Sequence, residues 1–176
     1  MTKQDQKKWD SRYLKNSGGQ TPSDILSGYL SFIPKGRALD IACGNGRNTK
    51  ILVQEGFRVD AVDISNVALS QLPDNDTRIN KMCRDMDTWQ IPQNRYHLVI
   101  NIRFLDRRLF PMIKKSLRPG GVLIFESFVG TERDYCLNPN ELLHAFNDFR
   151  IVYYEEREND PSAKFDQSVY MVAIKI

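Results

Sequence analysis

The sequence predicts a doubly wound α/β domain whose seven-stranded sheet is mostly parallel and ends in an antiparallel hairpin. Residues 38–63 read as a strand, a glycine turn, a helix and a second strand, which is the crossover unit of a parallel sheet. Strand-like and helix-like segments then alternate as far as residue 128. The last two strand-like runs, 150–156 and 168–176, have only a polar stretch between them, so they can pair antiparallel.

Length and composition fit one globular domain. The chain has 176 residues, of which 41% are hydrophobic and 27% charged, and a chain of this size can bury a full core without disulfides or a metal. Apolar runs such as Val122–Phe125 are far too short to cross a bilayer. Three widely spaced cysteines without a CxxC pair suggest neither a disulfide framework nor a zinc site, and no secretory signal is legible. We therefore expect a cytoplasmic protein with no membrane partner and no metal.

Each element has a local signal. Thr21 as a cap, Pro22 at the first helical position and Asp24 three residues after the cap predict a helix that ends at Pro34. The same signature recurs at 138–141 and predicts a second capped helix. Between them we expect strand 38–42, helix 48–55, strand 57–63, helix 66–72, strand 79–83, strand 96–101, helix 109–117 and strand 122–128.

The loop after the first strand is the place to look for a ligand, since open parallel sheets bind ligands at the carboxyl ends of their strands. Gly44 and Gly46 allow a tight turn and a close approach to the backbone. Thr49 stands where a dinucleotide site usually has its third glycine, and the chain has no GxxxxGK[ST] run. Asp40, at the end of the strand, would repel a pyrophosphate but attract an ammonium group.

Two further acidic residues suggest an adenosine. Asp63 closes the second strand, where a carboxylate can accept hydrogen bonds from both ribose hydroxyls. Asp85 follows the third strand and could accept a hydrogen bond from the exocyclic amine of adenine, with Met86 packed on the ring. An adenosine with a positively charged tail is S-adenosylmethionine, so we expect this cofactor.

These residues also carry a family resemblance. The matching segments are Trp9–Tyr13, Ala38–Asn48, Val62–Ser65, Arg84–Met86 and Leu117–Gly121. With them the chain resembles the class I S-adenosylmethionine-dependent methyltransferases, which have a Rossmann-like fold. Within that superfamily it is similar to the small bacterial tellurite-resistance (TehB-like) and type-11/12 methyltransferases. The resemblance runs from residue 9 to about residue 128.

The resemblance implies a role for each matching position. One methyltransferase domain would span 1–176, with an N-terminal helical cap at 1–35, a cofactor-binding core at 36–128 and a C-terminal helix and hairpin at 129–176. Asp40 and the glycine turn would hold the methionine moiety, Asn101 would border the methyl group, and Arg12 would reach the methionine carboxylate. The implied cofactor-binding residues are Asp40, Ala42, Gly44, Asn45, Gly46, Asn48, Asp63, Ile64, Asp85, Met86, Asn101 and Arg12.

The acceptor is less defined than the cofactor. Arg103 and Phe104 are the candidate substrate residues: Arg103 would favour a carboxylate or an oxyanion if it faces the pocket, and otherwise belongs to a solvated helix start. The aromatic residues Trp89, Phe104, Phe128 and Tyr135 could line an acceptor pocket or belong to the core. The residues after Asn101 lack the Asn/Asp-Pro-Pro-aromatic motif, which disfavours adenine-N6 and glutamine methylation.

Three functions stay open at this point. We favour a methyltransferase that acts on a small-molecule acceptor, and no catalytic base is evident. An RNA or protein methyltransferase and a non-catalytic S-adenosylmethionine-binding subunit are the alternatives. The net charge of +3 is mild and the sequence has no zinc finger or RNP-type motif, so nucleic acid is not an expected partner.

Overall fold

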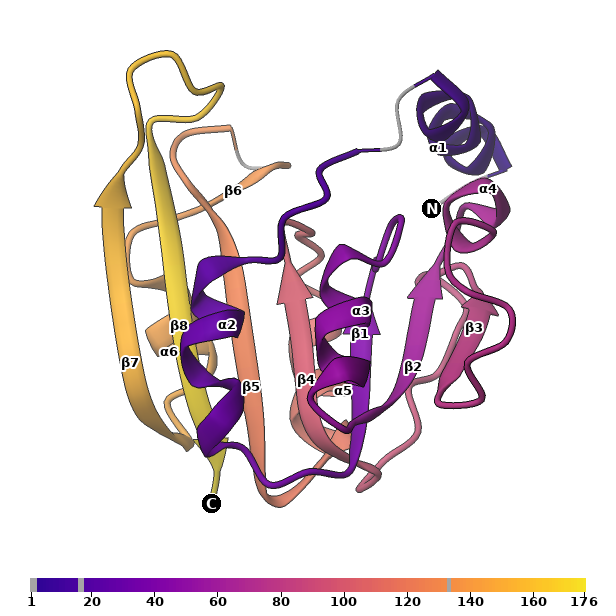
Figure 1. The fold of residues 1–176 in the computed structure, drawn as a ribbon. Helices are drawn as coiled ribbons and strands as arrows, with labels where there is room; N and C mark the ends of the chain where they lie inside the picture. The colour runs from indigo at the N-terminus through magenta and orange to yellow at the C-terminus, as the bar shows by residue number, and fades with distance from the viewer. Residues whose placement is uncertain (1–2, 16–17, 133) are drawn as a thin grey trace. The chain divides into compact units, whose positions relative to one another are not determined.

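The structure, a computed structural model, describes residues 3–15, 18–132 and 134–176. The chain forms two compact units, Met1–Ile91 and Pro92–Ile176. Each unit combines strands with helices that pack on them (Figure 1). Within the described residues, no helix is long and apolar enough to cross a membrane.

Three parallel strands form the sheet of the first unit, in the order β3 (Ile79–Cys83), β2 (Arg58–Asp63) and β1 (Arg37–Ile41) (Figure 1). The register sets Asp40 beside Ala61 on the neighbouring strand. The parallel crossover predicted from the sequence is thereby confirmed. Because the strands are parallel, their carboxyl ends, and the loops that follow them, lie at one edge of the sheet.

The helices of the first unit are α1 (Lys3–Lys15), α2 (Asp24–Tyr29), the 3-10 turn η1 (Leu30–Phe32), α3 (Arg47–Gln54) and α4 (Asn66–Leu69). The helix expected to start at Thr21 begins instead at Asp24, with Ser23 as its cap residue. The cause is tertiary. The backbone N–H of Ser23, which a Thr21 cap would accept, donates to Oδ1 of Asn48 at 3.0 Å.

The second unit contains β4 (Tyr96–Ile102), α5 (Leu109–Ser116), β5 (Leu117–Val129), β6 (Cys136–Leu137), α6 (Glu141–Ala145), β7 (Phe149–Glu158) and β8 (Gln167–Lys175). Strand β4 pairs parallel with β5, whereas β5 with β8 and β8 with β7 pair antiparallel (Figure 1). The predicted C-terminal hairpin is confirmed. So is the predicted fold class, a mostly parallel sheet with antiparallel strands at the C-terminus.

Two features of this unit differ from the sequence expectation. Strand β5 begins at Leu117 rather than Val122, because Leu117 already pairs with Tyr96 before a register shift. Strand β6 was not expected. It has two residues, too few to show the alternation by which a strand is recognised, and it is defined by its pairing with the end of β5.

Aromatic packing forms the core behind β5. The ring of Phe110 on α5 meets Phe125 on β5 edge to face, with centroids 5.9 Å apart, and lies 5.5 Å from the ring of Phe146. Phe146 in turn packs on Phe149 at the start of β7. These contacts tie both helices of the unit to the sheet, so the loops at the carboxyl ends of the strands have a fixed base.

Candidate functional site

The turn between β1 and α3 has a backbone that ordinary residues rarely adopt. Ala42, Gly44 and Gly46 all have left-handed conformations, with φ of 53°, 57° and 76°. A Cβ on Gly44 would lie 2.4 Å from the hydroxyl oxygen of Tyr13, and one on Gly46 would lie 2.0 Å from a methyl carbon of Leu72. The left-handed backbone and the close neighbours therefore favour glycine at both positions.

Asp63 holds this turn from the end of β2. One carboxylate oxygen accepts the backbone N–H of Gly44 at 2.8 Å, and the other accepts the N–H of Ser65 at 2.8 Å. Burial raises the pKa of Asp63 above its usual range, while these N–H donors lower it. A carboxylate offers about four acceptor positions, so that of Asp63 keeps capacity for a further donor, such as a hydroxyl.

Asp40 is fully buried at the end of β1. Its Oδ2 accepts the hydroxyl of Thr49, on α3, at 2.6 Å. Burial, reinforced by repulsion from Asp63, raises the pKa of Asp40 to about 7, even though the Thr49 hydrogen bond lowers it. Thr49, which stands where a dinucleotide site usually has its third glycine, is thus the partner of Asp40. Sequence spacing alone did not reveal this role.

Helix α1 covers the turn. Oδ1 of Asp10 accepts the hydroxyl of Ser65 at 2.5 Å and the backbone N–H of Val67 at 3.3 Å, which fastens α1 to the start of α4. Tyr13, one turn further along α1, lies against Gly44. Burial, followed by repulsion from the Asp63 carboxylate, raises the pKa of Tyr13 to about 12. Sequence reasoning noted the segment that holds both residues but gave neither a role.

The segment after α1 also contacts the turn. The side-chain amide of Asn45 donates to the carbonyl of Gly19 at 3.2 Å, and Nη1 of Arg47 donates to the carbonyl of Thr21 at 3.0 Å. Asn45 and Asn48 are both predicted cofactor residues, and the structure uses each to hold the chain that precedes α2. Their contacts with a cofactor stay predictions.

The remaining predicted cofactor residues of this unit lie near the ends of the strands or on α1. Parallel pairing sets Asp63 beside Cys83, two residues before Asp85, so both carboxylates follow neighbouring strands at one edge of the sheet. Oδ1 of Asp85 accepts the backbone N–H of Asp87 at 2.9 Å. Ile64 and Met86 are buried, whereas Arg12 is exposed, with its guanidinium 5.0 Å from the ring of Trp9.

These residues fit an adenosyl cofactor with a methionine tail. The edge of the sheet offers two carboxylates with remaining acceptor capacity, a backbone turn free of side chains at two positions, and a buried apolar residue, Met86, beside the second carboxylate. Among the described residues, no group of three or more histidine, cysteine, aspartate or glutamate side chains could hold a metal ion.

In the second unit, Asn101 stands near the end of β4, beside Phe125 on β5. Its side chain is fully buried, and within the described residues neither its carbonyl oxygen nor its amide nitrogen has a hydrogen-bond partner. A buried amide without partners costs stability, so such a group calls for an explanation such as a functional role or a bound water or ion. The predicted role of Asn101 beside the methyl group stays a prediction.

Arg103 follows β4 in a left-handed conformation, with a φ of 59°. Its backbone N–H donates to the carbonyl of Glu126 at 2.7 Å, and its Nε donates to the Glu126 carboxylate at 2.6 Å. The Glu126 side chain is 4% exposed and that of Arg103 53%. Sequence reasoning missed Glu126, since nothing in the chain links residues 23 positions apart. The next residue, Phe104, is half-buried.

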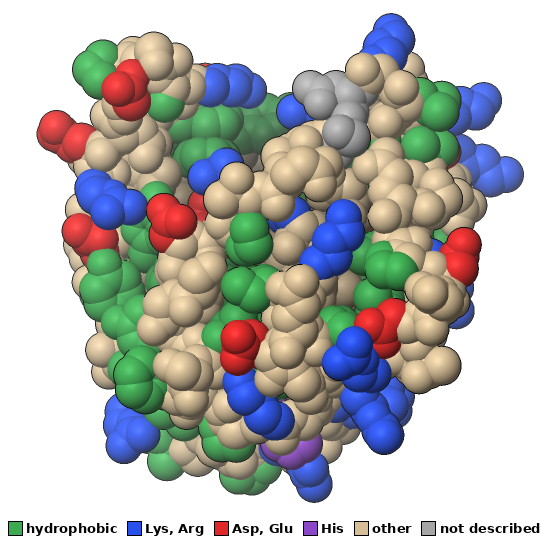
Figure 2. All heavy atoms as spheres, viewed as in Figure 1, with side chains coloured by type: hydrophobic (Ala, Val, Ile, Leu, Met, Phe, Trp, Pro, Cys, Tyr) green, Lys and Arg blue, Asp and Glu red, His purple; other side chains and the backbone are tan. Residues whose placement is uncertain are grey.

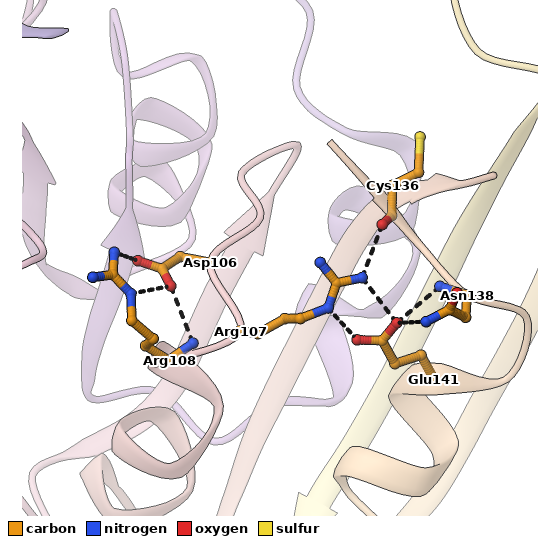
Figure 3. Close-up of polar contacts among 6 residues, drawn as sticks. All are labelled: Asp106, Arg107, Arg108, Cys136, Asn138 and Glu141. Atoms are coloured by element: carbon orange, nitrogen blue, oxygen red, sulfur yellow. Dashed lines mark hydrogen bonds and ion pairs between the residues drawn. The ribbon is translucent and has the colours of Figure 1, made fainter. Parts of the chain in front are cut away.

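The other two arginines of this loop are paired as well (Figure 3). Nε and Nη2 of Arg107 donate to the two carboxylate oxygens of Glu141, at 2.5 and 2.9 Å, and Nη2 also donates to the carbonyl of Cys136. Arg108 binds Asp106 within the loop at 2.7 Å. The bidentate pair lowers the pKa of Glu141 and fastens the loop after β4 to α6.

Comparison with known proteins indicates which family the sequence resembles. Residues 38–121 match the family described as a methyltransferase domain, and the sequence matches no curated protein. Among solved structures, TehB from Haemophilus influenzae superposes with a TM-score of 0.78 at 19% identity, over 96% of this chain and 67% of that chain.

Two further solved structures share the fold. The 1,6-didemethyltoxoflavin-N1-methyltransferase of Burkholderia thailandensis, solved with 1,6-didemethyltoxoflavin and S-adenosylhomocysteine bound, has a TM-score of 0.72 at 16% identity, over 97% of this chain and 86% of that chain. The cyclase SpnF has a TM-score of 0.70 at 15% identity, over 86% of this chain and 78% of that chain. At such identities, likeness of structure shows the fold.

Proposed function

We propose that this protein is an S-adenosylmethionine-dependent methyltransferase that transfers a methyl group to a small-molecule acceptor, since residues 38–121 match a methyltransferase domain family. The observation that carries the proposal is the clamp between Asp63 and the glycine turn. It leaves carboxylate acceptor capacity beside a backbone that a ligand can approach closely. A ribose with two free hydroxyls is the ligand that this arrangement suits.

The proposed cofactor contacts follow from position. Asp63 would accept the ribose hydroxyls, Asp85 and Met86 would hold the adenine, and the turn at 42–46 would face the methionine moiety. Asp40, with a pKa of about 7, would ionise fully when an ammonium group approaches it. Arg12 on α1 and Asn101 on β4 complete the proposed set, with the methionine carboxylate and the methyl group as their partners.

The chemistry needs little from the protein beyond alignment. S-adenosylmethionine supplies an electrophilic methyl: a lone pair of the acceptor forms the new bond to carbon while the carbon–sulfur bond breaks and its electron pair stays on sulfur. The chain's residues bind and orient the reactants. Helix α1, held by Asp10 and carrying Tyr13 against Gly44, would cover part of the turn and reduce its contact with water.

Charge distribution supports a small acceptor over a nucleic acid. On the face shown in Figure 2, Lys and Arg side chains gather over α1 at the upper right and elsewhere mix with Asp and Glu. The net charge is only +3. A groove that tracks an RNA backbone would need a more continuous basic surface. The Burkholderia methyltransferase, which shares this fold, holds a small molecule together with S-adenosylhomocysteine. We also propose that the protein is cytoplasmic.

Calorimetry tests the cofactor first. S-adenosylhomocysteine should bind the purified protein and NAD should not. Heat from NAD alone would refute the cofactor assignment. Methyl transfer is then followed with radiolabelled S-adenosylmethionine and small anionic acceptors, with total RNA and protein extract as the competing acceptors. Label in the RNA or protein fraction alone would replace the small-molecule proposal, and cofactor binding with no transfer to any acceptor would favour a binding subunit or another reaction of this fold.

A further inference from the structure

We propose that the acceptor is a planar aromatic anion, bound at the carboxyl ends of β4 and β5 by the guanidinium of Arg103 and by the paired rings of Phe128 and Phe165. The inference rests on the proposed function, whose acceptor it narrows to one chemical class. Four observations within the second unit carry it: a fixed cation, its buried anchor, an aromatic pair on the same face and a second cation beside that pair.

Arg103 is a cation with its orientation fixed. The backbone carbonyl of Glu126 accepts the backbone N–H of Arg103, and the Glu126 carboxylate accepts Nε of Arg103. The left-handed backbone and the side chain of Arg103 are therefore both held by one residue. Within the described residues, the terminal amino groups Nη1 and Nη2 make no hydrogen bond, and about half of the side chain is exposed. These amino groups can donate in parallel to the two oxygens of one carboxylate.

Glu126 is the anchor that makes this orientation possible. Its side chain is almost fully buried, on β5 beside the last residue of β4 and beside β8. A buried carboxylate needs a cation, and Arg103 supplies one through Nε alone. The pair therefore fixes the guanidinium through Nε and leaves its outer edge for a ligand. We assign Glu126 as a positioning residue.

The aromatic pair lies on the same face as this anchor. Phe128 is two residues after Glu126 on β5, so their side chains share one face of the strand. The ring of Phe128 lies 4.4 Å from that of Phe165, tilted by 31°, and both residues are half-buried. Such a pair exposes part of its aromatic surface, on which another flat ring can stack.

A second cation stands beside the pair. Nζ of Lys164 lies 4.7 Å from the ring centre of Phe165 and 5.2 Å from that of Tyr135, and the Tyr135 side chain is 55% exposed. Arg103 is bound to Glu126, two residues before Phe128 on β5, and Lys164 lies over the ring of Phe165, so a ligand that contacts both cations and the rings should be flat and negatively charged. A saturated ring would lose the stacking, and an uncharged ring would lose the pairing with Arg103.

Binding to the protein saturated with S-adenosylhomocysteine tests the inference. The probes are benzoate and 2-naphthoate, their uncharged amides benzamide and 2-naphthamide, and the non-aromatic anion cyclohexanecarboxylate. The aromatic carboxylates should bind at least about tenfold more tightly than the amides and than cyclohexanecarboxylate. Equal binding of 2-naphthoate and 2-naphthamide would overturn the inference.

Matched variants assign each preference to its residue. Arg103→Ala should abolish the preference for carboxylate over amide, whereas Arg118→Ala, the same charge change at the opposite end of β5, should keep it. Phe165→Leu should abolish the preference for the aromatic carboxylates over cyclohexanecarboxylate. Phe32→Leu, at a residue that is 80% exposed, should keep this preference. An unchanged preference in Arg103→Ala or Phe165→Leu would refute the corresponding contact.

A second variant guards against a folding defect, since Arg103→Ala leaves Glu126 buried without this cation. Arg103→Lys keeps a positive charge near Glu126 but loses the planar pair of donors, so the preference for carboxylate should fall several-fold while the protein stays folded by circular dichroism. An Arg103→Lys variant with the full preference would contradict the bidentate contact. Failure of S-adenosylhomocysteine to bind the parent would refute the proposed function instead, so the two failures are distinguishable.

Discussion

Replacing Asp40 with asparagine removes one titrating group from the interior of the first unit. The carboxyl of Asp40 is fully buried and accepts the hydroxyl of Thr49 at 2.6 Å. Asparagine has the same shape, and its carbonyl oxygen can accept the same hydroxyl. The variant therefore isolates the effect of ionisation on stability.

The sign of that effect follows from the direction of the shift. Burial raises the pKa of Asp40 from 3.8 in the unfolded reference to about 7 in the folded protein. Between these values the folded state holds a proton that the unfolded state has lost, so the contribution to stability is full below about pH 4 and is lost as the pH rises through 7. A shift of roughly three pKa units corresponds to on the order of 4 kcal/mol across this window.

Urea unfolding followed by circular dichroism from pH 4 to pH 8 measures the contribution. The free energy of unfolding of the parent should fall with rising pH more steeply than that of Asp40→Asn, with the two curves separating chiefly between pH 4 and 7. Burial also raises the pKa of Asp63, but this residue is present in both proteins, so its effect on stability largely cancels in the comparison. Parallel curves for the two proteins would refute an elevated pKa at Asp40.

Three further predictions concern the other contacts. Asp63→Ala should weaken S-adenosylhomocysteine binding at least tenfold by calorimetry, and should lower the urea midpoint because the N–H of Gly44 loses its acceptor; unchanged affinity would contradict the ribose assignment. Gly44→Ala should lower the free energy of unfolding by about 1–2 kcal/mol through its left-handed backbone alone. Adding Tyr13→Phe to this variant should restore only the part of the loss that comes from the clash with the Tyr13 hydroxyl. Arg107→Ala should lower the free energy of unfolding by roughly 1–2 kcal/mol, whereas Arg108→Ala, whose side chain is 68% exposed, should change it by less than about 0.5 kcal/mol. Equal effects of the two arginines would argue against the anchoring role of the bidentate pair.

The sequence by itself determined the order and type of most elements after residue 36. Strand 79–83 has the predicted bounds, and the crossover at 38–63 is parallel as expected. These predictions succeed because the alternation of side chains along a strand and the conformational freedom of glycine are properties of a few consecutive residues. The same local signals identified Gly44, Gly46 and Asp63 as candidates for the site.

Tertiary structure decided what those candidates touch. Thr49 is the partner of Asp40, Tyr13 lies against Gly44, and Glu126 anchors Arg103. Each pair joins residues between 9 and 31 positions apart, on different elements, and no local pattern specifies such a contact. The pKa of Asp40 near 7 belongs to the same class of property, because it arises from the burial that the whole unit imposes on the end of β1. Short-range geometry is encoded residue by residue, whereas desolvation and long-range pairing exist only once the chain has folded.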